Sequence, residues 1–223
     1  MPRSRVSGLV ERPLLRGYLH AGAAVAAALG GTYLVVRSSG DRPQQLSMLV
    51  YGAGLTLLFA VSALYHVRTW APARRAILRR IDHANIFVLI AATYTPITVN
   101  VFSGWWRVGI LSAVWGLALA GVSAAVAGVQ LPRWARAGLY VGMGWIALAA
   151  LGQIAAVLPW PAIGLLITGG VLYSAGALLY AAKWPGLWPR VFGYHEAFHL
   201  MTIAAAGSFY VVMLVYVLGA PRP

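Results

Sequence analysis

The chain has 223 residues, of which 61% are hydrophobic and only 9% are charged. A water-soluble domain carries roughly 25% charged residues. A soluble fold with only 9% charged residues could not cover its surface with polar groups. The net charge of +13 comes from Lys and Arg in short stretches between apolar runs. This pattern excludes a nucleic-acid-binding domain, which carries its basic patch on a polar, soluble fold. Composition therefore predicts an integral membrane protein with no nucleic-acid partner.

Seven apolar segments are each long enough to cross a bilayer, which takes about 20 helical residues. The first follows four arginines, like a signal peptide, but it is long enough to span the membrane and more apolar segments follow it, so we expect it to be retained. We predict an all-α integral membrane bundle of seven transmembrane helices that forms a single domain over residues 1–223. The expected helices cover residues 14–36, 46–67, 81–101, 107–127, 137–157, 161–182 and 195–218.

The basic residues predict how this bundle is oriented. With the N-terminus inside, 13 of the 17 Lys and Arg residues fall on the cytoplasmic side. Such a bias favours a cytoplasmic N-terminus and an external C-terminus, because cytoplasmic loops carry the excess of positive charge. We therefore expect a multi-pass protein of the cytoplasmic (inner) membrane whose basic loops contact anionic membrane lipids.

Few ionisable side chains lie inside the seven segments, and intramembrane groups of this kind by default indicate function. Ser62 and His66 lie in the last two turns of the second segment, Asp82 opens the third, and His195 and His199 open the seventh. In the predicted topology all five are at the inner ends of their helices. They share a layer about one helical turn thick, roughly 5–6 Å, which predicts a common site.

The residue types in this layer point to a metal. The chain contains no cysteine, which excludes a thiolate site. Three neutral imidazoles with an open fourth position, here His66, His195 and His199, form a typical catalytic zinc shell. Ser62 would hydrogen-bond the attacking water or a developing oxyanion, and Asp82 would orient that water or a ligand histidine.

Taken singly, each of these residues also has an ordinary structural interpretation. A lone histidine such as His66 in a membrane helix often only makes an interhelical hydrogen bond. Asp82 could pair with Arg79 or Arg80 at a helix start, where the helix dipole favours an acid. Only the shared depth of the five residues favours the metal interpretation.

The residues next to the predicted site leave alternatives open. Residues 195–199 read H-E-x-x-H, a zinc-protease signature in which Glu196 would be the general base. We prefer the competing interpretation, in which Glu196 points about 100° away from His195 and interacts with the positive N-terminus of its helix. We assign His20 and His83 to packing or hydrogen bonding, although His20 is deep enough in the first helix to approach the same cavity.

Four stretches of this chain resemble the bacterial hemolysin III family, part of the progestin and adiponectin receptor superfamily of seven-helix zinc membrane proteins. The resemblance covers nearly the whole chain and keeps the order of the motifs. The matching stretches are Ser62–His66, Arg80–Phe87, Ala92–Pro96 and Phe192–His199.

The resemblance implies zinc held by His66, His195 and His199, with Asp82 and Ser62 holding or activating water. It also implies kinship with ceramidase-like hydrolases. We therefore expect a zinc-dependent hydrolase or lipid-homeostasis protein that acts on lipid amide or ester bonds and takes its substrate from the inner leaflet. The alternatives are a membrane sensor or receptor with structural zinc, and a hemolysin-type channel or cytolysin. We find no secretion signal and no amphipathic pore segment that would support a cytolysin.

Overall fold

The computed structural model describes residues 13, 15–186, 188 and 191–220. Within these residues, seven helices are long and apolar enough to cross a membrane, as the sequence predicts. Four of the seven spans are single helices at the start of the chain, the fifth is broken by a 3₁₀ segment, and the seventh ends in a π-helical turn. The elements are α1 (Tyr18–Arg37), α2 (Arg42–Val67), α3 (Pro72–Val101), α4 (Gly104–Val126), α5 (Arg133–Gly144), the 3₁₀ segment Trp145–Ala150, α6 (Leu151–Val157), α7 (Trp160–Ala182), α8 (Tyr194–Val211) and the π segment Val212–Val217.

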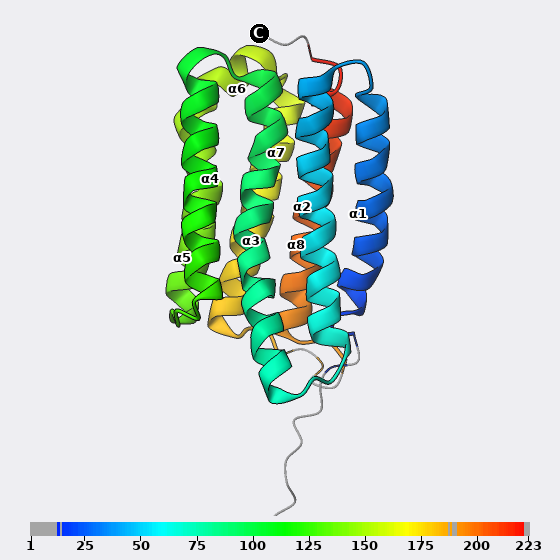
Figure 1. Ribbon diagram of the computed structural model, residues 1–223, viewed down its shortest axis with the longest axis vertical. Coiled ribbons are helices and arrows are strands. Elements are labelled where there is room, and N and C mark those ends of the chain that lie inside the picture. The colour runs from blue at the N-terminus through cyan, green and yellow to red at the C-terminus, as the bar shows by residue number, and fades with distance from the viewer. Residues whose placement is uncertain (1–12, 14, 187, 189–190, 221–223) are drawn as a thin grey trace, which may run out of the picture.

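The helices form one upright bundle in which α3 stands between α2 and α4 (Figure 1). Along the chain, α1 packs on α2, α2 on α3 and α3 on α4, while α7 packs on α8. Within its most apolar window, 61% of α3 is buried, against 17% for α4. A polar side chain on α3 therefore reaches the interior of the bundle, whereas α4 is largely an outer helix.

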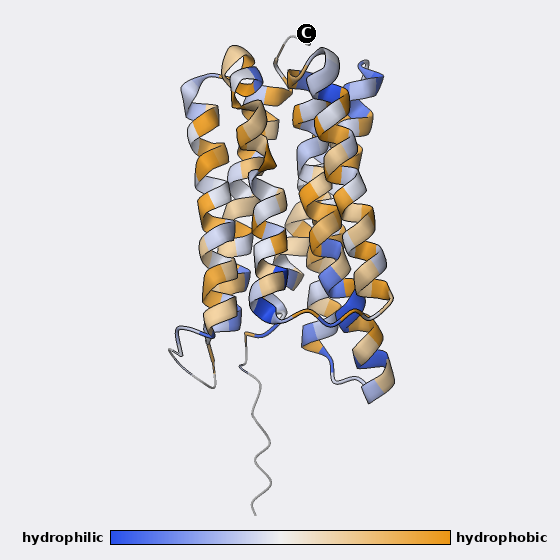
Figure 2. Ribbon diagram, turned by 90° about the vertical axis from the view of Figure 1, so that its left-hand side faces the viewer, coloured by the Kyte–Doolittle hydropathy of each residue, from blue (hydrophilic) through white to orange (hydrophobic). Residues whose placement is uncertain are grey.

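Hydrophobic residues make up much of the helices, and hydrophilic residues gather toward the ends of the bundle (Figure 2). Leu29, Leu119 and Leu178, on three different helices, are each more than 60% exposed. Such a surface is stable against lipid rather than water. Exposed tryptophans near helix ends, including Trp105 and Trp160, match the aromatic belt of a membrane protein.

The first two helices approach each other closely at a pair of glycines. A Cβ added to Gly31 would lie 2.9 Å from the Cα of Gly52, and one added to Gly52 would lie 2.8 Å from the Cα of Gly31. Backbones pack this tightly in membranes where small residues face one another. This contact holds α1 against α2 and so brings the start of α1 to the end of α2.

The helix ends differ from the predicted boundaries where charged residues extend a helix beyond the apolar span. The third helix begins at Pro72 rather than at residue 81, because Pro72 suits the first helical turn and arginine is a good helix former. Likewise, the second begins at Arg42, where the Asp41 side chain accepts a hydrogen bond from the Gln44 N–H. Hydropathy reports only the part of a helix that is apolar.

One end of the bundle, which we call the basic end, holds the starts of α1, α3, α5 and α8 and the C-terminal ends of α2, α4 and α7. Arg16, Arg68, Arg74 and Arg133 lie there. Arg3, Arg5, Arg12, Arg190 and Arg222, which also entered the prediction of orientation, lie outside the described residues.

Candidate metal centre

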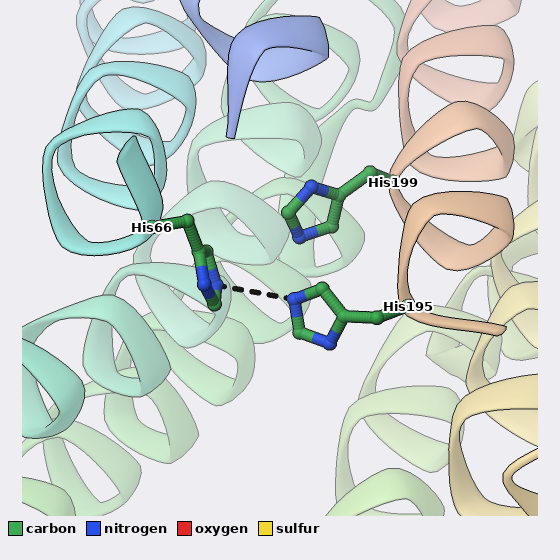
Figure 3. Close-up of side chains that lie close together, drawn as sticks. All are labelled: His66, His195 and His199. Atoms are coloured by element: carbon green, nitrogen blue, oxygen red, sulfur yellow. Dashed lines mark hydrogen bonds between the residues drawn. The ribbon is translucent and has the colours of Figure 1, made fainter. Parts of the chain in front are cut away.

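Three histidines from two helices meet at the basic end (Figure 3). One nitrogen from each of His66, His195 and His199 lies within 4.8 Å of the other two. The Nε2 atoms of His66 and His195 are 3.1 Å apart, and the ring centroids of His195 and His199 are 4.5 Å apart. The structure thus brings together all three ligands that the sequence predicts.

The local sequence explains how the imidazoles reach this point. His66 is in the last turn of α2, which ends at Val67, and α8 begins at Tyr194, directly before His195. His195 and His199 are four residues apart, so they project from one face of α8. Because α2 ends and α8 begins at the same end of the bundle, the three rings occupy one layer.

The arrangement fits a metal ion of zinc's size. Tetrahedral zinc with Zn–N bonds of about 2.0–2.1 Å separates its ligand nitrogens by about 3.3–3.4 Å. The Nε2 atoms of His66 and His195, 3.1 Å apart, are slightly closer than this spacing. The 4.8 Å limit on the distances among all three histidine nitrogens is longer than it. His199 is 2% exposed and its Nδ1 has no hydrogen-bond partner. A closely packed set of imidazoles in which a buried nitrogen has no partner suits metal coordination.

Ser62 lies four residues before His66 on α2, and Asp82 of α3 interacts with the Ser62 side chain. A side-chain hydrogen bond joins them, the Ser62 hydroxyl donating to the Asp82 carboxylate. Ser62 is buried and Asp82 is half-buried, and both line the same cavity as the three imidazoles. Arg136 of α5 has an electrostatic effect on Asp82, while Arg80 donates to the Val126 carbonyl of α4.

His20, from α1, lies against the cluster of three histidines. Its ring stacks on that of His199, with centroids 3.7 Å apart and planes 11° from parallel. Imidazole lone pairs lie in the ring plane, and two nearly parallel planes do not meet at a nearby point. His20 is therefore poorly placed to share an ion with His199, although it is 2% exposed and neither ring nitrogen has a partner. Packing, the role expected from the sequence, describes it best.

Both carboxylate oxygens of Glu196 accept hydrogen bonds at the start of α8. Its Oε1 accepts from Arg16 Nε at 2.8 Å and its Oε2 accepts from the Gly193 N–H at 2.9 Å. The carboxylate is 0% exposed and caps the helix N-terminus. Both oxygens are therefore occupied, which favours the capping interpretation of the H-E-x-x-H sequence over that of a general base.

Arg16 and Gly17 lie against the residues of the site. Gly17 has φ +86°, a conformation that suits glycine, and a Cβ there would lie 2.9 Å from the Cβ of His66. Arg16 in turn is hydrogen-bonded to Glu196, next to His195. The start of α1 therefore ties the two ligand-bearing helices together. This contact could not be predicted from the sequence, because Arg16 and Glu196 are 180 residues apart.

His83 contacts residues of α5, although it lines the same cavity as the three candidate ligands. Its Nδ1 is 3.3 Å from an Arg136 nitrogen, and its backbone carbonyl accepts from the Tyr140 hydroxyl at 3.0 Å. Since arginine only donates, Nδ1 of His83 is the acceptor in that contact.

A cavity of about 490 Å³ opens beside the candidate metal centre and continues through the bundle. Its walls beyond the site are mainly apolar, from α3, α5, α7 and α8. They include Ile86, Ile90, Val141, Leu166 and Phe209. The cavity reaches Phe102 and Ile163, which lie toward the opposite end of the bundle. A long, apolar space that ends at a polar cluster is suited to an acyl chain with its head at the histidines.

Comparison with known proteins agrees with this architecture. The model of the haemolysin-III-related family matches residues 9–210. The Hemolysin-3 homolog of Bacillus subtilis (strain 168) is 30% identical over 176 residues, which cover 79% of each chain. Hemolysin-3 of Bacillus cereus is 27% identical over 96% of each chain. The heptahelical transmembrane protein ADIPOR2 of Oryza sativa subsp. japonica is 31% identical over 74% of this chain and 79% of its own.

Proposed function

The chain belongs to the haemolysin-III-related family of multi-pass membrane proteins, and on that premise we propose that it is a zinc-dependent hydrolase of lipid amide or ester bonds. The observation that carries this proposal is the convergence of three imidazoles, an aspartate and a serine where an apolar cavity begins. Polar groups that could perform hydrolysis thus lie next to a space suited to a lipid chain.

His66, His195 and His199 would hold the ion and leave a position open toward the cavity. Zinc in a three-histidine shell lowers the pKa of water toward about 7 and polarises a carbonyl group. The other side chains of the site then position the reactants and move the proton.

Asp82 would take the proton from the attacking water and pass it to the leaving group. The hydrogen bond from Ser62 holds the carboxylate in place for this role. Ser62 has a single hydroxyl proton, so donating it to Asp82 leaves none for the substrate. Stabilisation of the oxyanion by Ser62 would require that the hydroxyl rotate away from Asp82 during the reaction.

The substrate would be a membrane lipid that enters from the inner leaflet of the cytoplasmic membrane. This placement follows from the predicted orientation, with the N-terminus and the basic end cytoplasmic and the C-terminus outside. The lipid-facing outer surface and the internal cavity are both apolar, so an acyl chain exchanges one apolar environment for another on entry.

The main alternative is a sensor or receptor in which zinc is structural. A structural zinc site is closed, with four protein ligands. Here three imidazoles adjoin a cavity, and His20 is stacked parallel to His199 rather than directed at the same point. The geometry therefore supports the hydrolase better than the sensor.

Two measurements test the proposal. The first is the zinc content of purified protein, which we expect to be near one per chain in the wild type and near zero in the His195→Ala, His199→Ala variant. His83→Ala is the control, because it removes a histidine at the same end outside the ligand set.

The second measurement is release of fatty acid from amide- and ester-linked lipids in detergent. Asp82→Asn should keep its zinc and lose turnover, while Asp41→Asn at the far end of α2 should keep both. If no lipid is cleaved by zinc-loaded wild-type protein, the hydrolase is refuted. If zinc stays bound after both histidines are replaced, the metal site itself is refuted.

A further inference from the structure

Arginines gather where the cavity meets the basic end. Of the charged residues that line the cavity, five are arginines and one is the acid Asp82. Such an excess of positive charge inside a cavity favours an anionic ligand. The five arginines, which we call the arginine cluster, are Arg16, Arg75, Arg79, Arg133 and Arg136.

The structure leaves donor capacity in this cluster unused. Arg16 is paired with Glu196, and Arg136 contacts His83. In contrast, Nη1 of Arg133 is buried without any hydrogen-bond partner, although its guanidinium lies 5.6 Å from the centre of the Tyr180 ring. Burying a charged donor unsatisfied is unfavourable unless a ligand accepts its hydrogen bond. The Arg133 guanidinium therefore lies over the Tyr180 ring with one buried donor that lacks an acceptor in the protein.

The cluster lies next to the metal centre rather than at the bilayer surface alone. Arg16 and Arg133 both act electrostatically on His195, and Arg136 acts on Asp82. Arg74 is exposed at the same end of the bundle and does not line this cavity. Arg75 and Arg79 are also exposed, whereas Arg133 and Arg136 are half-buried in the cavity wall. The ordinary excess of cytoplasmic arginines accounts for Arg74 but not for guanidinium groups that line an internal cavity.

We propose that Arg133 and Arg136, with Arg79 and Arg75 at the rim, bind the phosphate of an anionic phospholipid headgroup. Guanidinium groups recognise phosphate through paired hydrogen bonds, and the apolar cavity provides space for the acyl chain. This inference deepens the proposed function on which it rests, since it makes the substrate a phosphate-bearing lipid rather than a neutral, ceramide-like one.

Binding to the metal-free His195→Ala, His199→Ala protein tests the site without requiring turnover. The probes are dihexanoyl phosphatidic acid, dihexanoylglycerol, inorganic phosphate and hexanoate, titrated calorimetrically in uncharged detergent. Phosphatidic acid should bind at least about tenfold more tightly than each of the other three. Arg133→Gln and Arg136→Gln, added singly, should each weaken it about tenfold or more, as loss of a charged hydrogen bond implies. Arg74→Gln, which removes the same charge at the same end, should leave binding unchanged.

Several outcomes would overturn the site. Equal affinity for dihexanoylglycerol would show no recognition of phosphate, and equal affinity for inorganic phosphate would indicate a site for soluble anions. Tighter binding of hexanoate would indicate a site for a carboxylate product. An equal loss in Arg74→Gln would indicate general surface attraction. Arg133→Lys keeps the charge but loses the paired hydrogen bonds. This variant should fold and bind phosphatidic acid more weakly than the protein that keeps Arg133.

The two proposals fail separately. Selective binding of phosphatidic acid without lipid cleavage by the zinc-loaded protein would refute only the hydrolase. Cleavage of neutral lipids with no preference for phosphatidic acid would refute only the headgroup site.

Discussion

The contact between Arg16 and Glu196 should control zinc affinity from outside the ligand set. Glu196 has no exposed surface and Arg16 retains 26% exposure of its side chain, with 2.8 Å between Nε and Oε1. Removing one partner of a fully buried ion pair costs about 3–5 kcal/mol. Because Arg16 is partly exposed, we expect the lower end of that range, about 3 kcal/mol in the free energy of unfolding, for Arg16→Gln.

Loss of this ion pair should weaken zinc binding because Glu196 caps the helical turn that carries His195. The carboxylate also accepts from Gly193, so Glu196→Gln weakens two contacts at once. Replacement of a group that orients a ligand typically lowers metal affinity about 10–100-fold. We expect both Arg16→Gln and Glu196→Gln to weaken zinc binding within that range, and Glu196→Gln to weaken it more because it also affects the contact with Gly193.

Competition with a chelating dye, performed on purified protein in detergent, measures this affinity. Arg37→Gln, at the opposite end of α1, is the matched control and should bind zinc like the wild type. The proposed role of the Arg16–Glu196 pair in zinc binding would be refuted if Glu196→Gln bound zinc normally but lost all hydrolysis while Arg16→Gln kept both. That result would assign Glu196 the role of general base.

Three further changes test the bundle and the site. Gly31→Ala should lower the free energy of unfolding by about 1–3 kcal/mol in a denaturing-detergent titration, because its Cβ meets the Gly52 backbone, whereas Gly22→Ala, with open space around it, should not. His20→Ala should weaken zinc binding measurably by removing the ring stacked on His199, and His20→Phe, which keeps a flat ring, should restore most of the affinity; equal losses would show that a nitrogen of His20 is needed. Removing zinc with a chelator should lower the unfolding temperature, since an ion present at 1,000 times its Kd stabilises the fold by about 4 kcal/mol, and an unchanged temperature would contradict binding to the folded state.

The number and order of the membrane helices could be predicted from the sequence because hydropathy is a local property. Each run of about 20 apolar residues must form a helix in lipid to satisfy its own backbone hydrogen bonds. The depth of His66, His195 and His199 followed from the same argument, since a residue's place in its helix sets its level in the bilayer. The same local rule missed the start of α3, because the arginines after Pro72 extend the helix without being apolar.

Hydropathy carries no information about which helices are neighbours or how each is rotated about its axis. The contact of Ser62 with Asp82, the stacking of His20 on His199 and the pairing of Arg16 with Glu196 depend on that packing. Arg16 and Glu196 are 180 residues apart, and nothing near either residue in the chain identifies the other. The sequence therefore determined the spans and the level of the candidate ligands, and the tertiary structure decided which side chains meet there, because long-range contacts arise only when helices pack.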